Sequence, residues 1–245
     1  MNQTEYIKER IETLGISVSD EQCEKLLRFY EMLVEKNKVM NLTAITEFED
    51  VVTKHFMDSA SIVMLGKLGE EKIVKLLSSG CRVLDLGTGA GFPGIPLKIL
   101  FPNLKITLMD SLNKRLVFLD EVIADLGLKN IKTVHARAEE FALKPDYREQ
   151  YDLVVSRAVA NLSLLSELCL GFVKPGGHFV PYKAGGSEEE IKAAEKAVSV
   201  MGGKQLAVYK FKLPGTELER TMPVIRKITS TPGKYPRNGK KLGVF

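Results

Sequence analysis

The most constraining feature of this sequence is a change of rhythm after residue 80, where short β-branched runs begin to alternate with amphipathic stretches. Five runs have the length and composition of strands, at residues 83–86, 106–109, 131–134, 153–155 and 179–182. Helical patterns separate or follow them, near residues 93–101, 112–126, 162–170 and 187–201. This alternation predicts an α/β fold, with a mostly parallel sheet that helices cover on both faces.

Two later apolar runs, at residues 205–213 and 222–228, have no long helix between them. Parallel neighbours need a crossover of a dozen or more residues, and the connection here is too short. We therefore expect an antiparallel pair of strands at the C-terminal end of the sheet.

The first 78 residues are polar and helical in pattern. Ser19 and Gln22 have the spacing of a capping box, which predicts that a helix starts at Asp20. We expect an N-terminal helical extension over residues 1–78, followed by a sheet domain over residues 79–245 that ends in a basic segment.

Composition excludes several classes of protein. The longest run without a charged side chain, residues 86–97, is interrupted by glycines and prolines and is too short to span a membrane. The first residues lack the basic and then apolar succession of a signal peptide. Three isolated cysteines are expected to be reduced core thiols of a cytoplasmic protein. The three histidines share no metal-ligand spacing, so we expect no metal site.

The sharpest motif is the glycine-rich run Asp85-Leu86-Gly87-Thr88-Gly89-Ala90-Gly91-Phe92-Pro93-Gly94, between a predicted strand and a predicted helix. Glycines let a chain turn sharply and let a ligand approach the backbone. The run fits the dinucleotide fingerprint, so the pattern alone does not choose the cofactor. The carboxylate of Asp85 favours S-adenosylmethionine, because it suits the ammonium of a methionyl group and repels a pyrophosphate. The long helical segment before the first strand also favours this cofactor.

Polar side chains follow the next strands, at the edge where open α/β sheets bind ligands. Asp110 ends the second strand and is suited to accept both hydrogen bonds of a ribose diol, although a helix cap is the alternative. After the third strand, the backbone of Ala138 and the side chain of Glu139 are placed to contact adenine. Arg157 ends the fourth strand at the same edge.

The segment from Arg220 to Phe245 carries seven basic residues and no acidic one, although the net charge of the whole chain is only +4. Such a segment fits a phosphate-rich partner, because each cation can displace a counterion from a nucleic acid. A solvated tail is the alternative.

Five segments together resemble the bacterial family of guanine-N7 methyltransferases of small-subunit ribosomal RNA, also called glucose-inhibited division protein B. They are the glycine-rich run and residues 41–43, 54–59, 152–160 and 231–239. The resemblance implies a Rossmann-like class I methyltransferase sheet with a C-terminal antiparallel strand, and S-adenosylmethionine as methyl donor. It also implies 16S rRNA or the small ribosomal subunit as partner, with a guanine in the decoding region (the 530 loop) as acceptor.

The resemblance assigns cofactor contacts to Gly87, Phe92, Ala138, Glu139 and Arg157. The glycine-rich motif and the end of the second strand add Asp85, Gly89 and Asp110 as candidates. The candidate RNA contacts are His55, Arg226, Lys227 and Arg237, with a packed helix histidine as the alternative for His55.

Guanine N7 carries a lone pair and no proton, so methyl transfer to it needs in-line placement and no general base. We therefore expect no catalytic dyad. Two other classes stay open at this point: an S-adenosylmethionine enzyme acting on a small molecule or protein, and a nicotinamide-dependent reductase.

Overall fold

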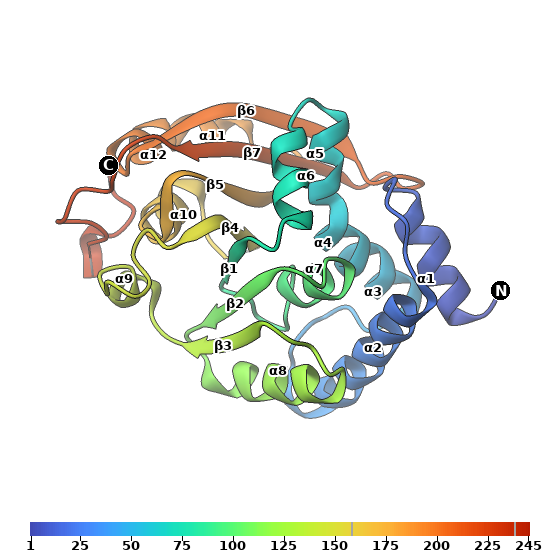
Figure 1. Ribbon diagram of the computed structural model, residues 1–245. Helices are drawn as coiled ribbons and strands as arrows, with labels where there is room; N and C mark the ends of the chain where they lie inside the picture. Colours follow the sequence, from blue (N-terminus) through green and yellow to red (C-terminus); the bar gives the residue numbers. More distant parts are fainter. Residues whose placement is uncertain (158, 238) are drawn as a thin grey trace.

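The computed structural model describes residues 1–157, 159–237 and 239–245 (Figure 1). These residues form a seven-stranded sheet with the strand order β3-β2-β1-β4-β5-β7-β6. The strands are β1 (Arg82–Leu86), β2 (Lys105–Asp110), β3 (Ile131–His135), β4 (Tyr151–Arg157), β5 (Val173–Ala184), β6 (Gly203–Lys212) and β7 (Glu219–Lys227). Strands β1 to β5 pair in parallel, and β7 runs antiparallel to both β5 and β6. The predicted parallel sheet with an antiparallel C-terminal pair is confirmed.

Helices cover the two faces of this sheet with separate hydrophobic clusters. The first face carries α1 (Gln3–Glu12), α2 (Asp20–Met40), α6 (Glu71–Ser78), α7 (Gly94–Leu100) and α8 (Asn113–Asp125). The second face carries α9 (Ala138–Phe141), α10 (Leu162–Leu170), α11 (Glu188–Ala193) and α12 (Glu195–Val200). The sheet is therefore the middle layer of three (Figure 1).

The N-terminal helices are anchored by the cap that the sequence predicts. The side chain of Ser19 accepts from the backbone N–H of Gln22, and the side-chain oxygen of Gln22 accepts from the backbone N–H of Ser19. This capping box starts α2 at Asp20, as expected. The buried side chains of α1 and α2 belong to the same cluster as those of β1 and α7. The extension and the sheet therefore share one core.

The segment after α2 is helical, as predicted, but changes type along its length. It consists of α3 (Phe48–Val51), the π-helical turn η1 (Val52–Met57), α4 (Asp58–Ala60), the 3-10 turn η2 (Ser61–Val63) and α5 (Met64–Lys67). A π-helical turn shifts the side chains that follow it around the helix, and such turns recur at functional sites. Here the turn contains His55 and leads directly into Asp58.

One predicted helix is divided in the structure. The pattern at residues 187–201 predicts a single helix, whereas α11 and α12 are separated at Ala194. Ile191, Ala194 and Val198 are all buried in the cluster on this face of the sheet. Both short helices therefore bury one face against the same cluster.

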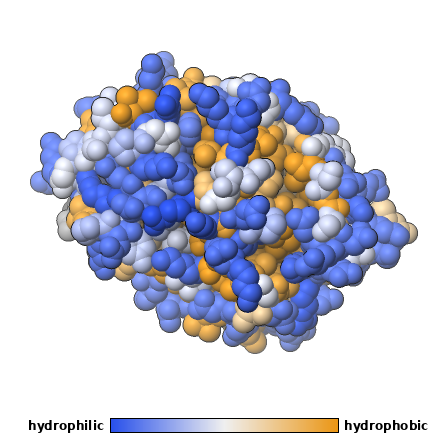
Figure 2. Space-filling view, viewed as in Figure 1, coloured by the Kyte–Doolittle hydropathy of each residue, from blue (hydrophilic) through white to orange (hydrophobic). Residues whose placement is uncertain are grey.

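Hydrophilic side chains cover much of the face shown in Figure 2, with apolar patches between them. In the described parts of the chain, no helix combines the length and the apolar character needed to cross a bilayer. The three cysteines, Cys23, Cys81 and Cys169, are buried and free, as expected of core thiols.

Candidate active site

The glycine-rich run forms the turn between β1 and α7, as the sequence predicts. Gly87 has a φ of +72°, and its N–H donates to the carbonyl of Met109 at 2.8 Å, which ties the turn to the end of β2. Gly89 has a φ of +59°, and its N–H donates to Asp110 Oδ2 at 2.9 Å. Both backbones lie in the left-handed region, which glycine adopts at little cost.

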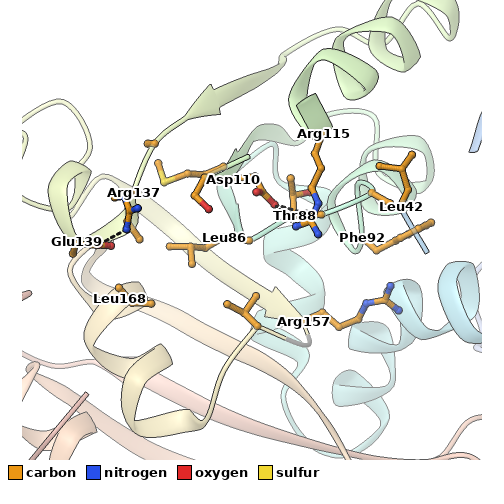
Figure 3. A pocket seen from close by; sticks show the side chains of 18 residues that line it. Leu42, Leu86, Thr88, Phe92, Asp110, Arg115, Arg137, Glu139, Arg157 and Leu168 are labelled. Atoms are coloured by element: carbon orange, nitrogen blue, oxygen red, sulfur yellow. Dashed lines mark hydrogen bonds and ion pairs between the residues drawn. The ribbon is translucent and has the colours of Figure 1, made fainter. Parts of the chain in front are cut away.

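A cavity of about 490 Å³ opens where the turn meets the carboxyl ends of β1, β2 and β4. It lies at the edge of the sheet where α/β proteins bind their ligands. Seven of the eight residues predicted to contact a cofactor line it: Gly87, Gly89, Phe92, Asp110, Ala138, Glu139 and Arg157. Figure 3 shows Asp110 and Thr88 on one wall, Glu139 on another, and Arg157 beside Phe92.

Asp85, the eighth predicted contact, is fully buried and does not line this cavity. Its Oδ2 accepts from the hydroxyl of Thr88 at 2.7 Å and from the N–H of Gly94 at 2.9 Å, so the carboxylate closes the turn from inside. Its Oδ1 is buried without a hydrogen-bond partner. Burial raises the pKa of Asp85 to about 6, against the lowering effect of those two hydrogen bonds. Asp85 therefore holds the turn from inside and does not itself reach the cavity wall.

Asp110 ties the glycine-rich turn to the residue that precedes α8. Its Oδ1 accepts from the N–H of Leu112 at 2.9 Å, at the start of α8, and its Oδ2 accepts from Gly89. Its side chain is 4% exposed and Arg115 lies 3.4 Å from Oδ2. Each carboxylate oxygen has two lone pairs, so the carboxylate can accept further hydrogen bonds in addition to these two.

The opposite wall is built at the end of β3 and the start of α9. Ala138 and Glu139 line the cavity, and Glu139 forms an ion pair of 3.8 Å with Arg137 (Figure 3). The side chain of Arg137 is 71% exposed at the cavity rim. Sequence reasoning named the segment around Arg137 but gave this side chain and Arg115 no role.

Arg157 reaches the cavity from the end of β4 and is held by a residue that the sequence analysis did not single out. Its guanidinium lies 2.7 Å from Asp58 Oδ2, and Asp58 Oδ1 lies 2.5 Å from Arg220. The guanidinium also donates to the carbonyl of Lys54 at 2.9 Å and lies 5.1 Å from the ring centre of Phe92. Asp58 thus fixes Arg157 against one wall of the cavity.

His55 is packed beneath this wall. Its ring stacks on Phe92 with centroids 4.3 Å apart, and its Nε2 lies 2.9 Å from the hydroxyl of Thr43. Burial, and then the charge of Arg157, lower the pKa of His55 to about 4, so the ring is neutral at neutral pH. His55 is 7% exposed, which fits the packed alternative and does not offer the ring to RNA.

Two predicted RNA contacts, Lys227 and Arg237, are corrected by the structure. Lys227 is fully buried, and its Nζ donates to the carbonyl of Leu170 at 2.6 Å and pairs with Glu149 at 3.4 Å. Burial lowers the pKa of Lys227 to about 8.

Arg237 binds a buried carboxylate in place of a phosphate. Its guanidinium donates to both oxygens of Glu167, at 2.9 and 2.8 Å, and Glu167 is 0% exposed. Although burial acts to raise it, the hydrogen bonds from Arg237 hold the pKa of Glu167 below its usual value. Of the three predicted basic contacts, Arg226 alone has an exposed side chain with no ion pair among the described residues.

Within residues 1–157, 159–237 and 239–245, no three histidine, cysteine or acidic side chains gather as metal ligands would.

Comparison with known proteins gives a consistent assignment. Residues 22–220 match the GidB family, described as rRNA small subunit methyltransferase G. The chain is 50% identical to the ribosomal RNA small subunit methyltransferase G of Lachnoclostridium phytofermentans, over 94% of this chain and 92% of the relative. It is 48% identical to the protein of the same name from Acetivibrio thermocellus, over 93% and 89%.

Solved structures share the fold at low sequence identity. A putative sarcosine dimethylglycine methyltransferase from Galdieria sulphuraria matches with a TM-score of 0.55 and 15% identity, over 84% of this chain and 98% of that chain. TrmN from Thermus thermophilus matches with a TM-score of 0.50 and 20% identity, over 72% and 53%. The sheet is thus that of the S-adenosylmethionine-dependent class I methyltransferases, and the chain belongs to the rRNA small subunit methyltransferase G family.

Proposed function

We propose that this protein transfers a methyl group from S-adenosylmethionine to N7 of a guanine in the decoding region of 16S rRNA, in the cytoplasm. The names of relatives that are about half identical over nearly the whole chain support ribosomal RNA as the substrate class. The choice of N7 is supported by the composition of the cavity.

The residues of the cavity fit the methyl donor. A side-chain atom added at Gly89 would meet no atom closer than the carbonyl oxygen of Gly87, at 4.0 Å, so this backbone faces open space. Gly87 and Gly89 would cradle the donor, Asp110 would accept its ribose diol, and Ala138 and Glu139 would contact its base. When bound, S-adenosylmethionine supplies a methyl group activated by a sulfonium.

The observation that carries the proposal is what the cavity wall lacks. Among its described residues there is no lysine, histidine, cysteine or tyrosine, and its two acids are Asp110 and Glu139. Asp110 is held by two backbone N–H groups and Glu139 is paired with Arg137. A wall without a free base suits an acceptor that has no proton to lose, and guanine N7 is such an acceptor. The residues of the wall therefore bind and orient the methyl donor and the guanine.

The charge of Arg157 suits the same reaction. Methyl transfer moves positive charge onto the purine, so an unpaired cation beside the base would oppose it. Asp58 lies 2.7 Å from the guanidinium, so this cation is ion-paired, with a carboxylate that it shares with Arg220. The planar guanidinium then provides a surface for a base that has left its stack, which an RNA substrate requires.

The direct test is methyl transfer to RNA from cells that lack this protein. The purified protein is incubated with labelled S-adenosylmethionine and either naked 16S rRNA or assembled small subunits, and the labelled nucleoside is mapped by mass spectrometry. We expect 7-methylguanosine at one position in the decoding region. Label on another base, or on protein in place of RNA, would refute the proposal.

A further inference from the structure

A second cavity, of about 410 Å³, lies at the edge of the sheet opposite the candidate active site. It is formed by α6 and by the amino ends of β4 and β5, where Leu153 pairs with His178, whereas the first cavity lies at the carboxyl ends of the strands. The charged and titratable groups that line it are Lys72 and Lys75 from α6, Asp152 from β4, and Lys174 and His178 from β5.

His178 is a buried polar side chain with an unmet hydrogen-bonding group. It is 7% exposed, and its Nδ1 is buried without a partner among the described residues. A buried ring nitrogen without a partner costs stability, so such groups are rare unless a ligand or water completes them. Burial, and then the charges of Arg226 and Lys72, lower the pKa of His178 to about 4.

Positive charge surrounds this histidine without matching acids. Arg226 on β7 is directly opposite His178 in the antiparallel ladder, and Lys204 on β6 is directly opposite Arg226. Within the described residues, none of Arg226, Lys204, Lys72 and Lys75 forms an ion pair. Like charges placed opposite one another in a sheet are destabilising unless an anion lies between them.

The one acid that lines the cavity is already neutralised. Asp152 forms an ion pair with Lys174 and accepts from the backbone N–H of Arg82 at 2.8 Å. Those contacts hold its pKa below the usual value, although burial acts to raise it. The electrostatic potential in this cavity is therefore set by the remaining cations and is positive.

We propose that this second cavity binds a backbone phosphate of the RNA substrate through Lys72 and the ring of His178, with Arg226 opposite His178 on the neighbouring strand. The inference rests on the proposed function, because it extends the RNA footprint to the sheet edge opposite the methyl-donor cavity. A phosphate oxygen accepts from ammonium, guanidinium and imidazole N–H donors alike. The cations continue from the cavity along β7 and β6 to Arg226 and Lys204, which suits a polyanion better than a single free phosphate.

The first arm of the test uses inorganic phosphate alone. The ring resonances of His178, assigned by their loss in His178→Gln, are titrated against pH with phosphate or with chloride at the same ionic strength. We expect phosphate to raise the pKa of His178, because a bound anion favours the protonated ring. The exposed His135 serves as the internal control and should not respond. A pKa of His178 that is the same in both salts would overturn the proposal.

The second arm uses 16S rRNA and separates RNA from free phosphate. Arg226→Ala and Lys72→Ala should each lower the slope of log K against log salt by about one, and Arg226→Lys should restore it. Lys196→Ala, an exposed cation of α12 on the other face of the sheet, should leave the slope unchanged. S-adenosylhomocysteine should bind all four variants equally.

The outcomes separate this proposal from the function on which it rests. If phosphate moves the pKa of His178 but both slopes equal that of the wild type, the cavity binds free phosphate only and the RNA contact is refuted. If the wild type transfers no methyl group to RNA, the proposed function fails, and the phosphate titration still decides whether the cavity binds an anion.

Discussion

The carboxylate of Asp58 lies 2.7 Å from the guanidinium of Arg157, although 99 residues separate them in the chain. Asp58 begins α4, and Arg157 ends β4 at the wall of the candidate active site. The second oxygen of Asp58 binds Arg220 on β7. One buried carboxylate therefore joins the N-terminal helices to two strands and fixes a cavity residue.

Asp58→Asn should reduce both stability and activity. The substitution leaves two guanidinium groups, each about 15% exposed, without their negative partner. Removing one member of a buried ion pair costs about 3 kcal/mol of unfolding free energy. Urea denaturation measures this loss. We expect the kcat for methyl transfer to fall more than the affinity for the donor, because Arg157 is no longer fixed.

The matched control is Asp50→Asn. Asp50 also pairs with a cation, Lys54, but both side chains are substantially exposed. An exposed ion pair contributes less than about 1 kcal/mol. Equal destabilisation by the two substitutions would contradict the role given to Asp58.

Gly89→Val should abolish donor binding while leaving the protein folded. A side chain at this position faces the cavity, and no atom lies closer than 4.0 Å, so the fold has room for it. The control is Gly127→Val, which has nearly the same φ, +61° against +59°, and no neighbour within 4 Å. Both variants should lose about 1–2 kcal/mol to backbone strain. In thermal shift assays only Gly127→Val should still be stabilised by S-adenosylhomocysteine, and loss in both would show that strain alone is responsible.

Much of the fold could be predicted because its signals are local. The capping box at Ser19 fixed the start of α2, and the glycine-rich run fixed the turn after β1. The site was predicted as far as the ends of the strands, since carboxyl ends of neighbouring parallel strands meet at one edge.

Charge pairing could not be predicted from the sequence. Lys227 and Arg237 belong to a segment without acids, yet Glu149 and Glu167 reach them from other elements. Arg237 and its partner Glu167 are 70 residues apart in the chain, so no local pattern relates them. Asp58 and Arg157 are 99 residues apart, so only the folded chain brings them together.

Arg237→Ala should destabilise the protein without changing how RNA binding responds to salt. The substitution leaves Glu167, which is 0% exposed, without its bidentate partner, at a cost of about 3 kcal/mol. Since Arg237 is committed to this carboxylate, the salt slope of RNA binding should equal that of the wild type. The neighbouring exposed Lys234→Ala should leave stability unchanged. A slope lowered by about one in Arg237→Ala would restore Arg237 as a phosphate contact.

Asp85→Asn should change the pH dependence of stability. The pKa of Asp85 is about 6 in the folded protein, against an ordinary value of 3.8. Below about pH 4 the carboxyl is protonated in both the folded and the unfolded protein, so it does not make stability depend on pH. As pH rises from about 4 to about 6, the Asp85 carboxyl ionises in the unfolded chain before it ionises in the folded protein. The unfolding free energy of the wild type therefore falls by about 3 kcal/mol over this range, and above pH 6 this loss is constant.

The measurement is the difference in unfolding free energy between Asp85→Asn and the wild type across this range. Other titrating groups cancel in the difference, and a constant offset from the new amide does not affect its slope. The difference should move in favour of the variant from pH 4 to pH 6. A flat difference would show that Asp85 is not held in a site that disfavours its charge.

The cavity beside the glycine-rich turn is the proposed methyl-donor site, and the proposed function depends on it. Titration calorimetry of S-adenosylhomocysteine into the wild type, Gly89→Val and Gly127→Val, with NAD in parallel, tests this directly. We expect one binding site for S-adenosylhomocysteine in the wild type and in Gly127→Val, none in Gly89→Val, and no heat of binding with NAD. Undiminished binding to Gly89→Val, or binding of NAD in place of S-adenosylhomocysteine, would contradict it.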